Sequence, residues 1–445
     1  MILFVVGPAY QAFLKGSTDS DAQHLAAMHA WHIGICAIVV SGLFKLVCAV
    51  GSGWVRRVIP RAGLLGSLAA IALVFISFLP LLDILHYPVV GMAALAVILT
   101  TLVARVDLPF KIPGALGALL VGCGVYYVMN GFGWLTPEPA TFQPENGLWP
   151  HEWLSVFSFE WVRAFPATLP YLPIVIPFAL ATVVGGIDCT ESAAAVGDEY
   201  PTGKIIAVEG IATLIAGCCG GVIQTTPYIG HPAYKAMGGR ALYTLATALF
   251  VGSAGLLGYF GFLYILIPKA AIFPILIFIG LEITAQSFHA TPQKHYAAVA
   301  FACIPAMASL VLIFTDNLLA QSGKSLDELF GQLPEQLQTL RILSGGFIVT
   351  SLLWASGLAA LIDRNLRRAA LFFAIAAVCS LFGVIHSPLP GNPLVVPWNL
   401  PASLPHAAAG QTPVYLAAGY GIMALILFVW SLGRGRDEKA NVEKG

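Results

Sequence analysis

Residues 62–82 read AGLLGSLAAIALVFISFLPLL, a stretch of apolar and small residues without a charged side chain. An α-helix needs about 20 such residues to cross the hydrocarbon core of a bilayer. Eleven further apolar runs lie near residues 30–51, 88–104, 112–130, 169–188, 204–223, 241–267, 270–287, 296–315, 343–363, 369–387 and 414–433. This pattern predicts an all-α polytopic membrane protein with about a dozen spans.

The composition agrees with a membrane location and excludes several classes of protein. Hydrophobic residues make up 58% of the 445-residue chain and charged residues only 10%, against about 25% in an ordinary globular domain. So few charges cannot cover a soluble enzyme, and a net charge of +0 offers no basic surface to nucleic acid. The eight cysteines lie in apolar runs, and the sequence has no ATP-binding or metal-binding motif. We therefore predict neither an enzyme nor a metal site, and no cofactor.

Lysines and arginines gather in alternate short loops, which sets the expected orientation. The clusters are Arg56, Arg57 and Arg61; Arg105 and Lys111; Lys235 and Arg240; Lys294; Arg364, Arg367 and Arg368; and Arg434, Arg436, Lys439 and Lys444. Because positive loops stay on the cytoplasmic side, we expect them and the C-terminus in the cytoplasm of a bacterial inner (plasma) membrane. Segment 132–168 is acidic and carries Trp134, Trp149, Trp153 and Trp161, which predicts an extracytoplasmic lid at the membrane interface.

Two short matches in the same order indicate an internal repeat. GPAYQAF at 7–13 corresponds to HPAYKAM at 231–237, and IPRA at 59–62 corresponds to IPKA at 267–270. The span count between the copies predicts inverted orientation, as in many secondary transporters. We expect a truncated first repeat at 1–131, a linker at 132–168, a second repeat at 169–363, and extra helices with a tail at 364–445. Two spans precede the match in the second copy only, so the symmetry predicts further helices upstream of Met1.

An acidic cluster at the end of one predicted span is the first candidate site. Residues 184–193 read VGGIDCTESA, and helical spacing places Asp188, Glu191 and Ser192 on one face. Charges inside a span are costly, and two neighbouring carboxylates can retain a proton near neutral pH. We interpret the cluster as a site for substrate binding and proton coupling. The alternative is a helix end with solvated acids, because Asp198 and Glu199 follow closely.

The segment 224–232, QTTPYIGHP, is the second candidate. Its two prolines prevent a continuous helix, and such backbone persists at membrane depth only where it is buried or lines a cavity. It would then present free backbone groups beside Tyr228, Ile229, Gly230 and His231. The alternative is an ordinary loop between spans.

Three other intramembrane charges are weaker candidates. Glu282 lies in an apolar helix and either faces a central cavity as a coupling group or lies at the cytoplasmic interface. We expect Glu209 to cap the start of a helix. Lys45 is expected to extend its ammonium group toward the interface.

These segments resemble the nucleobase–ascorbate (xanthine/uracil permease) transporter family, and within it the adenine, guanine and hypoxanthine permease branch. The resemblance depends on residues 183–240, which hold an acidic span, Glu209-Gly210, Thr225-Thr226, Tyr228-Ile229 and Gly238-Gly239-Arg240. It implies two inverted seven-helix repeats with broken helices, divided into a core and a gate domain, and a small-molecule substrate carried with a proton or Na⁺.

The resemblance also implies roles for individual residues. Asp188 falls where the family has its substrate-binding acid, Ser192 where that helix carries a second polar group, and Tyr228 and Ile229 on a short strand that contacts the base. The chain departs from the family at Gly230, where Glu or Gln is common, and we expect Glu191 to replace the lost acid. Pro227 is a further departure, inserted after the threonine pair.

The expected function is a secondary active permease for a purine or pyrimidine nucleobase in a lipid membrane. Two alternatives remain open: an anion transporter of the sulfate-permease kind without its regulatory domain, and a non-transporting protein on the same scaffold. No nucleic-acid partner is predicted, and a homodimer remains open.

Overall fold

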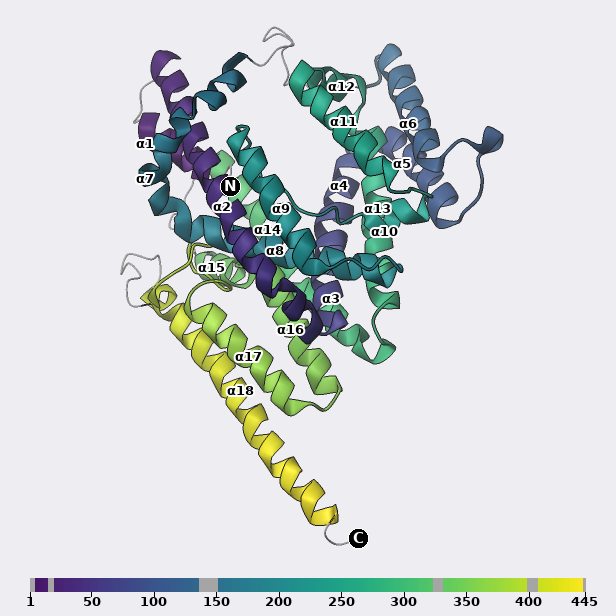
Figure 1. Ribbon diagram of the computed structural model, residues 1–445. Coiled ribbons are helices and arrows are strands. Elements are labelled where there is room, and N and C mark those ends of the chain that lie inside the picture. Colours follow the sequence, from purple (N-terminus) through teal and green to yellow (C-terminus); the bar gives the residue numbers. More distant parts are fainter. Residues whose placement is uncertain (1–4, 15–19, 136–150, 323–330, 398–406, 443–445) are drawn as a thin grey trace. The chain divides into compact units, whose positions relative to one another are not determined.

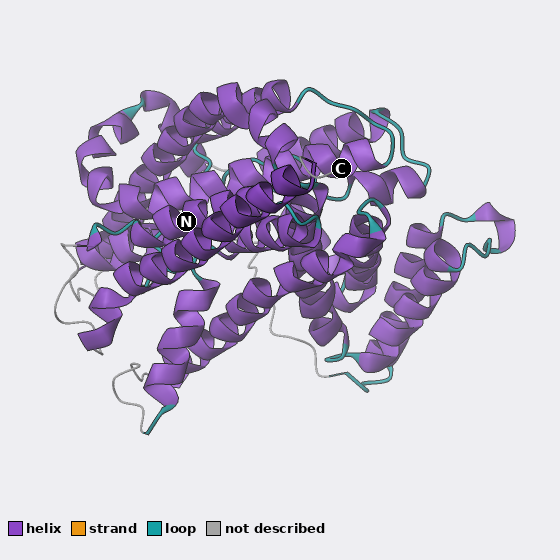
Figure 2. Cartoon of the chain, turned by 90° about the horizontal axis from the view of Figure 1, so that it is seen from below, coloured by secondary structure: helices purple, strands orange, loops and turns teal. Residues whose placement is uncertain are grey.

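A computed structural model describes residues 5–14, 20–135, 151–322, 331–397 and 407–442. These residues form helices and connecting loops, without a strand among them (Figures 1 and 2). The longer helices are α2 (Ser20–Val58), α3 (Arg61–Ile71), α5 (Pro88–Ile98), α6 (Gly114–Gly131), α8 (Leu172–Ala195), α9 (Thr202–Cys218), α11 (Leu242–Leu257), α13 (Lys269–His289), α14 (Tyr296–Ser322), α15 (Leu333–Ser344), α16 (Phe347–Ile362), α17 (Leu366–Leu381) and α18 (Ala407–Val442). The shorter segments are α1 (Gly7–Leu14), η2 (Ala72–Phe78), α4 (Leu79–Ile84), η3 (Leu99–Val103), η4 (Pro109–Lys111), η6 (His151–Ser158), η7 (Glu160–Ala164), α7 (Phe165–Thr168), η8 (Leu169–Tyr171), α10 (His231–Ala236), α12 (Phe260–Leu266) and η9 (Gln293–His295).

The architecture is that of an all-helical polytopic membrane protein. Within the described ranges, seven helical stretches are long and apolar enough to cross a bilayer: 21–58, 61–84, 114–131, 160–195, 269–289, 293–319 and 411–433. The pair α15 and α16, bent by 72°, makes an eighth if it is counted as one span. The dozen apolar runs therefore do not all become full-length helices. Run 241–267 breaks at Gly258, whose left-handed conformation (φ 71°) ends α11.

The chain divides into two compact units. Unit 1 contains residues 1–71, 156–228 and 287–445, and unit 2 contains residues 72–155 and 229–286. Within unit 2, Gly122 of α6 lies against Ala271 of α13, where an added Cβ atom would be 2.7 Å from the alanine methyl group. Such contacts between small residues let membrane helices approach closely. In unit 1, α2 packs along α9, and α17 lies beside α18 (Figure 1).

The two sequence matches have only partly similar local structure. Helix α10 begins at His231 after a turn, whereas residues 5 and 6 are already helical before α1 begins at Gly7. The helices α3 and α13 both begin at the basic residue after a proline, Arg61 and Lys269. The inverted orientation of the copies remains a prediction.

The Trp-rich segment is only partly described, because residues 136–150, with Trp149, lie outside the described residues. The side chain of Trp134 is exposed. Trp161 is instead buried in unit 1, where its indole nitrogen donates to the carbonyl of Val156 at 3.2 Å. Trp161 therefore belongs to the protein interior, where its ring cannot anchor a lid at the interface.

The turn between α15 and α16 depends on Gly346. This residue is in the left-handed region (φ 65°), and an added Cβ atom would lie 2.1 Å from the carbonyl oxygen of Val384 and 2.9 Å from Cα of Ile385. The loop after α17 therefore packs directly on the glycine. The amide of His386 donates to the carbonyl of Gly345 at 2.8 Å and fixes this contact.

We expect Gly346→Ala to destabilise the protein more than Gly133→Ala does. Gly133 has a similar φ of 70° but no atom within 4 Å of an added Cβ, so alanine there costs only the left-handed strain of about 1–2 kcal/mol. At Gly346 the clash with backbone adds about 1–3 kcal/mol. Thermal unfolding of the detergent-purified variants measures the difference. Equal melting temperatures would show that the loop can move away freely.

A buried histidine links the same loop to α15 and α18 directly, and to α16 through Tyr420. The Nδ1 atom of His386 lies 3.0 Å from the carbonyl of Ile342, which can only accept, so Nδ1 carries the proton. Nε2 then accepts from the hydroxyl of Tyr420 at 2.8 Å, and that hydroxyl accepts from the indole of Trp354 at 2.7 Å. Burial lowers the pKa of His386, although its bond to the Ile342 carbonyl opposes the change. The neutral imidazole of His386 is therefore the form that fits its two hydrogen bonds.

Stability should consequently fall in mild acid. The unfolded imidazole has a pKa of about 6.5 and the folded one a lower pKa, so the unfolded state binds more protons as the pH drops below about 6.5. The contribution of His386 is complete above that pH and is lost toward the folded pKa. Melting temperatures at pH 7.5 and pH 5.5 should differ more for the wild type than for His386→Gln. The exposed His24 provides the control, because His24→Gln should leave the difference between the two melting temperatures as in the wild type. If His24→Gln reduced that difference and His386→Gln did not, His386 would be excluded as its cause.

Candidate functional site

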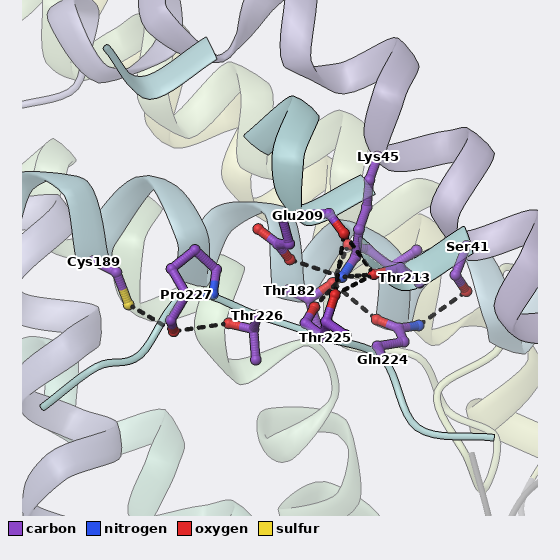
Figure 3. A network of polar contacts seen from close by, with 11 residues as sticks. Ser41, Lys45, Thr182, Cys189, Glu209, Thr213, Gln224, Thr225, Thr226 and Pro227 are labelled. Carbon is purple, nitrogen blue, oxygen red and sulfur yellow. Dashed lines mark hydrogen bonds and ion pairs between the residues drawn. The ribbon is translucent and has the colours of Figure 1, made fainter. Parts of the chain in front are cut away.

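A non-helical segment runs between α9 and α10, and its polar groups are held by neighbouring helices. Residues 221–228 have no regular secondary structure. The ammonium group of Lys45 on α2 donates to the carbonyl of Thr225 at 2.5 Å and to Oε1 of Glu209 at 2.7 Å (Figure 3). A single lysine thus satisfies an irregular backbone carbonyl and an acid of α9 together. This is how non-helical backbone can be tolerated inside a membrane protein.

The ion pair between Lys45 and Glu209 is almost completely excluded from solvent. The side chains are 0% and 2% exposed, respectively. Two glycines bring their helices together: a Cβ atom on Gly42 would lie 3.1 Å from the carbonyl of Gly210, and one on Gly210 would lie 3.2 Å from the carbonyl of Gly42. The close backbone approach places Lys45, one turn after Gly42, beside the acid.

Further polar side chains extend this network over three helices (Figure 3). The hydroxyl groups of Thr213 and Thr225 are 2.6 Å apart. Gln224 accepts from the hydroxyl of Thr182 at 2.8 Å and donates to the hydroxyl of Ser41 at 2.9 Å. The segment is therefore fixed to α2, α8 and α9 by side chains as well as by its own backbone.

Gly186 allows Glu209 to approach α8. A Cβ atom at this glycine would lie 2.7 Å from Oε2 of Glu209 and 3.5 Å from Cδ of Pro227. The Oε2 atom is buried and has no hydrogen-bond partner among the described residues. An acceptor without a donor remains at the centre of the network.

Asp188 provides a second such acceptor. Its side chain is fully buried, and Oδ2 accepts a hydrogen bond of 2.6 Å from the hydroxyl of Ser67 on α3. Within the described ranges, Oδ1 has no partner. A buried carboxyl oxygen without a donor is costly, so this position favours a bound proton or a ligand N–H group.

Glu191 lies one turn further along α8 in a different environment. Its Oε2 accepts from Nε of Arg56 and its Oε1 from Nε of Arg61, both at 2.7 Å. Asp188, Glu191 and Ser192 are all buried, which differs from the solvated acids of the alternative interpretation, although Glu191 does lie near the end of α8. The two carboxylates nevertheless have separate partners, and the charge of Glu191 is neutralised by two guanidinium groups.

The remaining predicted site residues do not form one cluster and are divided between the two units. Tyr228 is exposed at the end of the irregular segment in unit 1. Ile229, the buried Gly230 and His231 belong to unit 2, where Gly230 precedes α10, and Glu282 is half-buried on α13 in the same unit. The short strand expected at Tyr228 and Ile229 is not formed: Tyr228 ends the irregular segment and Ile229 lies in a turn. Pro227, just before them, cannot donate a hydrogen bond to a neighbouring strand.

Two expectations about single charges are wrong. Lys45 does not reach the interface; its side chain is buried against Glu209. Glu209 does not cap α9, which begins seven residues earlier at Thr202. The sequence signal that was missed is the lone charge itself, since a charged side chain in an apolar span is expected to be buried with a partner in the protein.

We expect removal of Lys45 to be far more harmful than removal of an exposed partner. Lys45→Met leaves Glu209 buried and unpaired, at a cost of about 3–5 kcal/mol. The double variant with Glu209→Gln should recover part of that loss. The control is Lys294→Met, which breaks the exposed ion pair with Asp363 and should cost about 0–1 kcal/mol. Thermal unfolding of the four proteins tests this; equal losses for Lys45→Met and Lys294→Met would contradict it.

Comparison with known proteins does not assign a family. No family model matches the chain, and a search of curated proteins finds no similar sequence. The likeness to nucleobase permeases therefore remains a prediction from residues 183–240.

Proposed function

We propose that the chain is a secondary active transporter whose substrate and coupling proton bind around Asp188 and Glu209. The observation that carries this proposal is the irregular segment 221–228, held between helices by the buried Lys45–Glu209 pair. Secondary transporters place their sites at such breaks, where backbone groups are free to meet a ligand. Intramembrane ionisable residues mark substrate and proton pathways for the same energetic reason.

The chemistry of the site favours a ligand that donates hydrogen bonds. Asp188 Oδ1 and Glu209 Oε2 are two buried acceptors without described donors. A nucleobase carries N–H groups that can satisfy such oxygens, and the likeness of residues 183–240 to purine permeases supports this substrate class. The cost of leaving both oxygens unpaired would then oppose the empty state and favour binding.

A proton is the coupling ion that best fits Asp188. The only described partner of its carboxyl group is the hydroxyl of Ser67, which is uncharged. Among the described residues no lysine or arginine is paired with Asp188, whereas Glu191 has two arginines and Glu209 has Lys45. Protonation would remove an unpaired buried charge. In this proposal Asp188 alternates between its protonated and ionised forms. Glu191 stays paired with Arg56 and Arg61 and holds the end of α8 in place.

Uptake measurements in proteoliposomes test the proposal. Labelled adenine, guanine, hypoxanthine, xanthine and uracil are compared with sulfate under an imposed pH gradient. We expect uptake of at least one base, driven by an inward proton gradient. Uptake of sulfate alone would support the anion-transporter alternative, and uptake of no compound by folded protein would support a non-transporting role.

Asp188→Asn should remove the pH-driven component of uptake. Loss of a charged hydrogen bond or proton site corresponds to about a tenfold or greater decrease. The matched control is Asp83→Asn, an exposed acid on α4, which should leave uptake unchanged. Melting temperatures confirm that both variants are folded. Asp188→Asn with wild-type uptake and wild-type pH dependence would exclude Asp188 from the mechanism.

A further inference from the structure

A charged cavity lies at the ends of four helices in unit 1. It has a volume of about 670 Å³ and is formed where α2 and α8 end and where α3 and α9 begin. Its charged lining residues are Arg56, Arg57, Arg61, Lys204, Glu191 and Glu199. Four positive and two negative groups leave a net charge of +2. We call this cavity the arginine pocket.

The position of the arginine pocket makes it accessible from water. Residues 59 and 60 connect the candidate spans 21–58 and 61–84, and a turn between two spans lies at a membrane surface. The side chains of Arg57, Arg61 and Lys204 are exposed. Both dissolved ions and lipid headgroups can therefore reach these groups.

The acids in the pocket leave most of its donors unused. Glu191 engages Arg56 and Arg61 through their Nε atoms only. Glu199 is 71% exposed and lies 3.4 Å from Arg56, which makes a weak pair. The terminal nitrogens of Arg61 and the ammonium group of Lys204 have no acceptor in the described part of the chain, and Arg57 donates only to the carbonyl of Gly53.

The start of α9 adds further donors. Pro201 precedes the helix and supplies no side-chain cap. Its carbonyl accepts from the amides of Lys204 and Ile205, whereas the amides of Thr202 and Gly203 have no described acceptor. Free amides at a helix start favour an anion. They supplement the cationic side chains, which remain the main feature of the pocket.

We propose that the arginine pocket binds a phosphate group, either of a dissolved phosphate compound or of a lipid headgroup. A phosphate monoester carries a charge of about −1.5 to −2 near pH 7, which matches the net charge of the pocket, whereas a carboxylate would leave one cation unpaired. The guanidinium fork suits its several oxygens. The cavity also has room for an attached organic group. This site is separate from the proposed transport function and does not depend on it.

Binding of inorganic phosphate to the detergent-purified full chain tests the site. At constant ionic strength maintained with chloride, phosphate should raise the melting temperature saturably. Arg57→Gln and Lys204→Gln should each weaken binding about tenfold, because each removes a charged hydrogen bond. Neither residue pairs with Glu191, which is held by Arg56 and Arg61, so the variants should remain folded. Arg367→Gln, which removes an exposed arginine of α17 outside the pocket, should bind like the wild type.

Vesicles distinguish the two sources of phosphate. The protein is reconstituted in phosphatidylcholine alone or with phosphatidic acid, whose headgroup is a phosphate monoester. If a lipid is the natural ligand, phosphatidic acid should weaken the apparent phosphate affinity of the wild type at least about tenfold; a dissolved ligand predicts equal affinities in both vesicles. The proposal is overturned if chloride stabilises as much as phosphate, or if the Arg57→Gln/Lys204→Gln double variant keeps wild-type affinity. Neither result would affect the uptake assay.

Discussion

The buried ion pair between Lys45 and Glu209 is the interaction on which the polar centre of unit 1 depends. Backbone that leaves the helical conformation inside a membrane protein must find hydrogen-bond partners in the protein itself. Lys45 provides one for Thr225, and Glu209 neutralises the lysine that does so. The glycine contact between α2 and α9 makes this geometry possible, since bulkier residues at Gly42 and Gly210 would separate the two helices.

Helix α8 gives its two acids opposite surroundings within one turn. Asp188 faces α3, where the hydroxyl of Ser67 is its described partner, and Glu191 faces Arg56 and Arg61 at the helix end. Both are buried, so burial alone does not distinguish them. The difference lies in the charge of the partner: the ionised form of Glu191 is compensated, and that of Asp188 is not. A single turn of helix therefore separates a position that suits an exchangeable proton from one that suits a fixed charge.

The sequence predicted the apolar helices well where hydrophobicity alone determines them. Run 62–82 becomes the helical stretch 61–84, and run 270–287 becomes α13. Hydrophobicity is a local property, so it predicts a span without knowledge of the neighbours. It failed in run 241–267, where Gly258 ends α11 although the apolar pattern continues. The burial of Asp188 and Glu191 could also be anticipated, because charged residues in an apolar run need protein partners.

The partners themselves could not be predicted from the pattern. Lys45 and Glu209 are 164 residues apart, and nothing in either helix specifies the other. Arg56 and Arg61 indicated orientation in the sequence, yet in the structure they also hold Glu191. A residue type reports what a side chain requires, and only the packing of distant helices determines which group meets that requirement.

The energetic role of the Lys45–Glu209 pair is best understood as positioning. Two apolar residues would avoid the desolvation penalty, and replacing a buried ion pair in this way is often neutral or stabilising. Such a replacement would, however, leave the carbonyl of Thr225 without its lysine donor and would remove the acid that approaches Gly186. The unsatisfied carbonyl would then favour a different path for residues 221–228. The pair therefore holds residues 221–228 in the observed path, in which the segment contacts both α8 with Asp188 and α9 with Glu209.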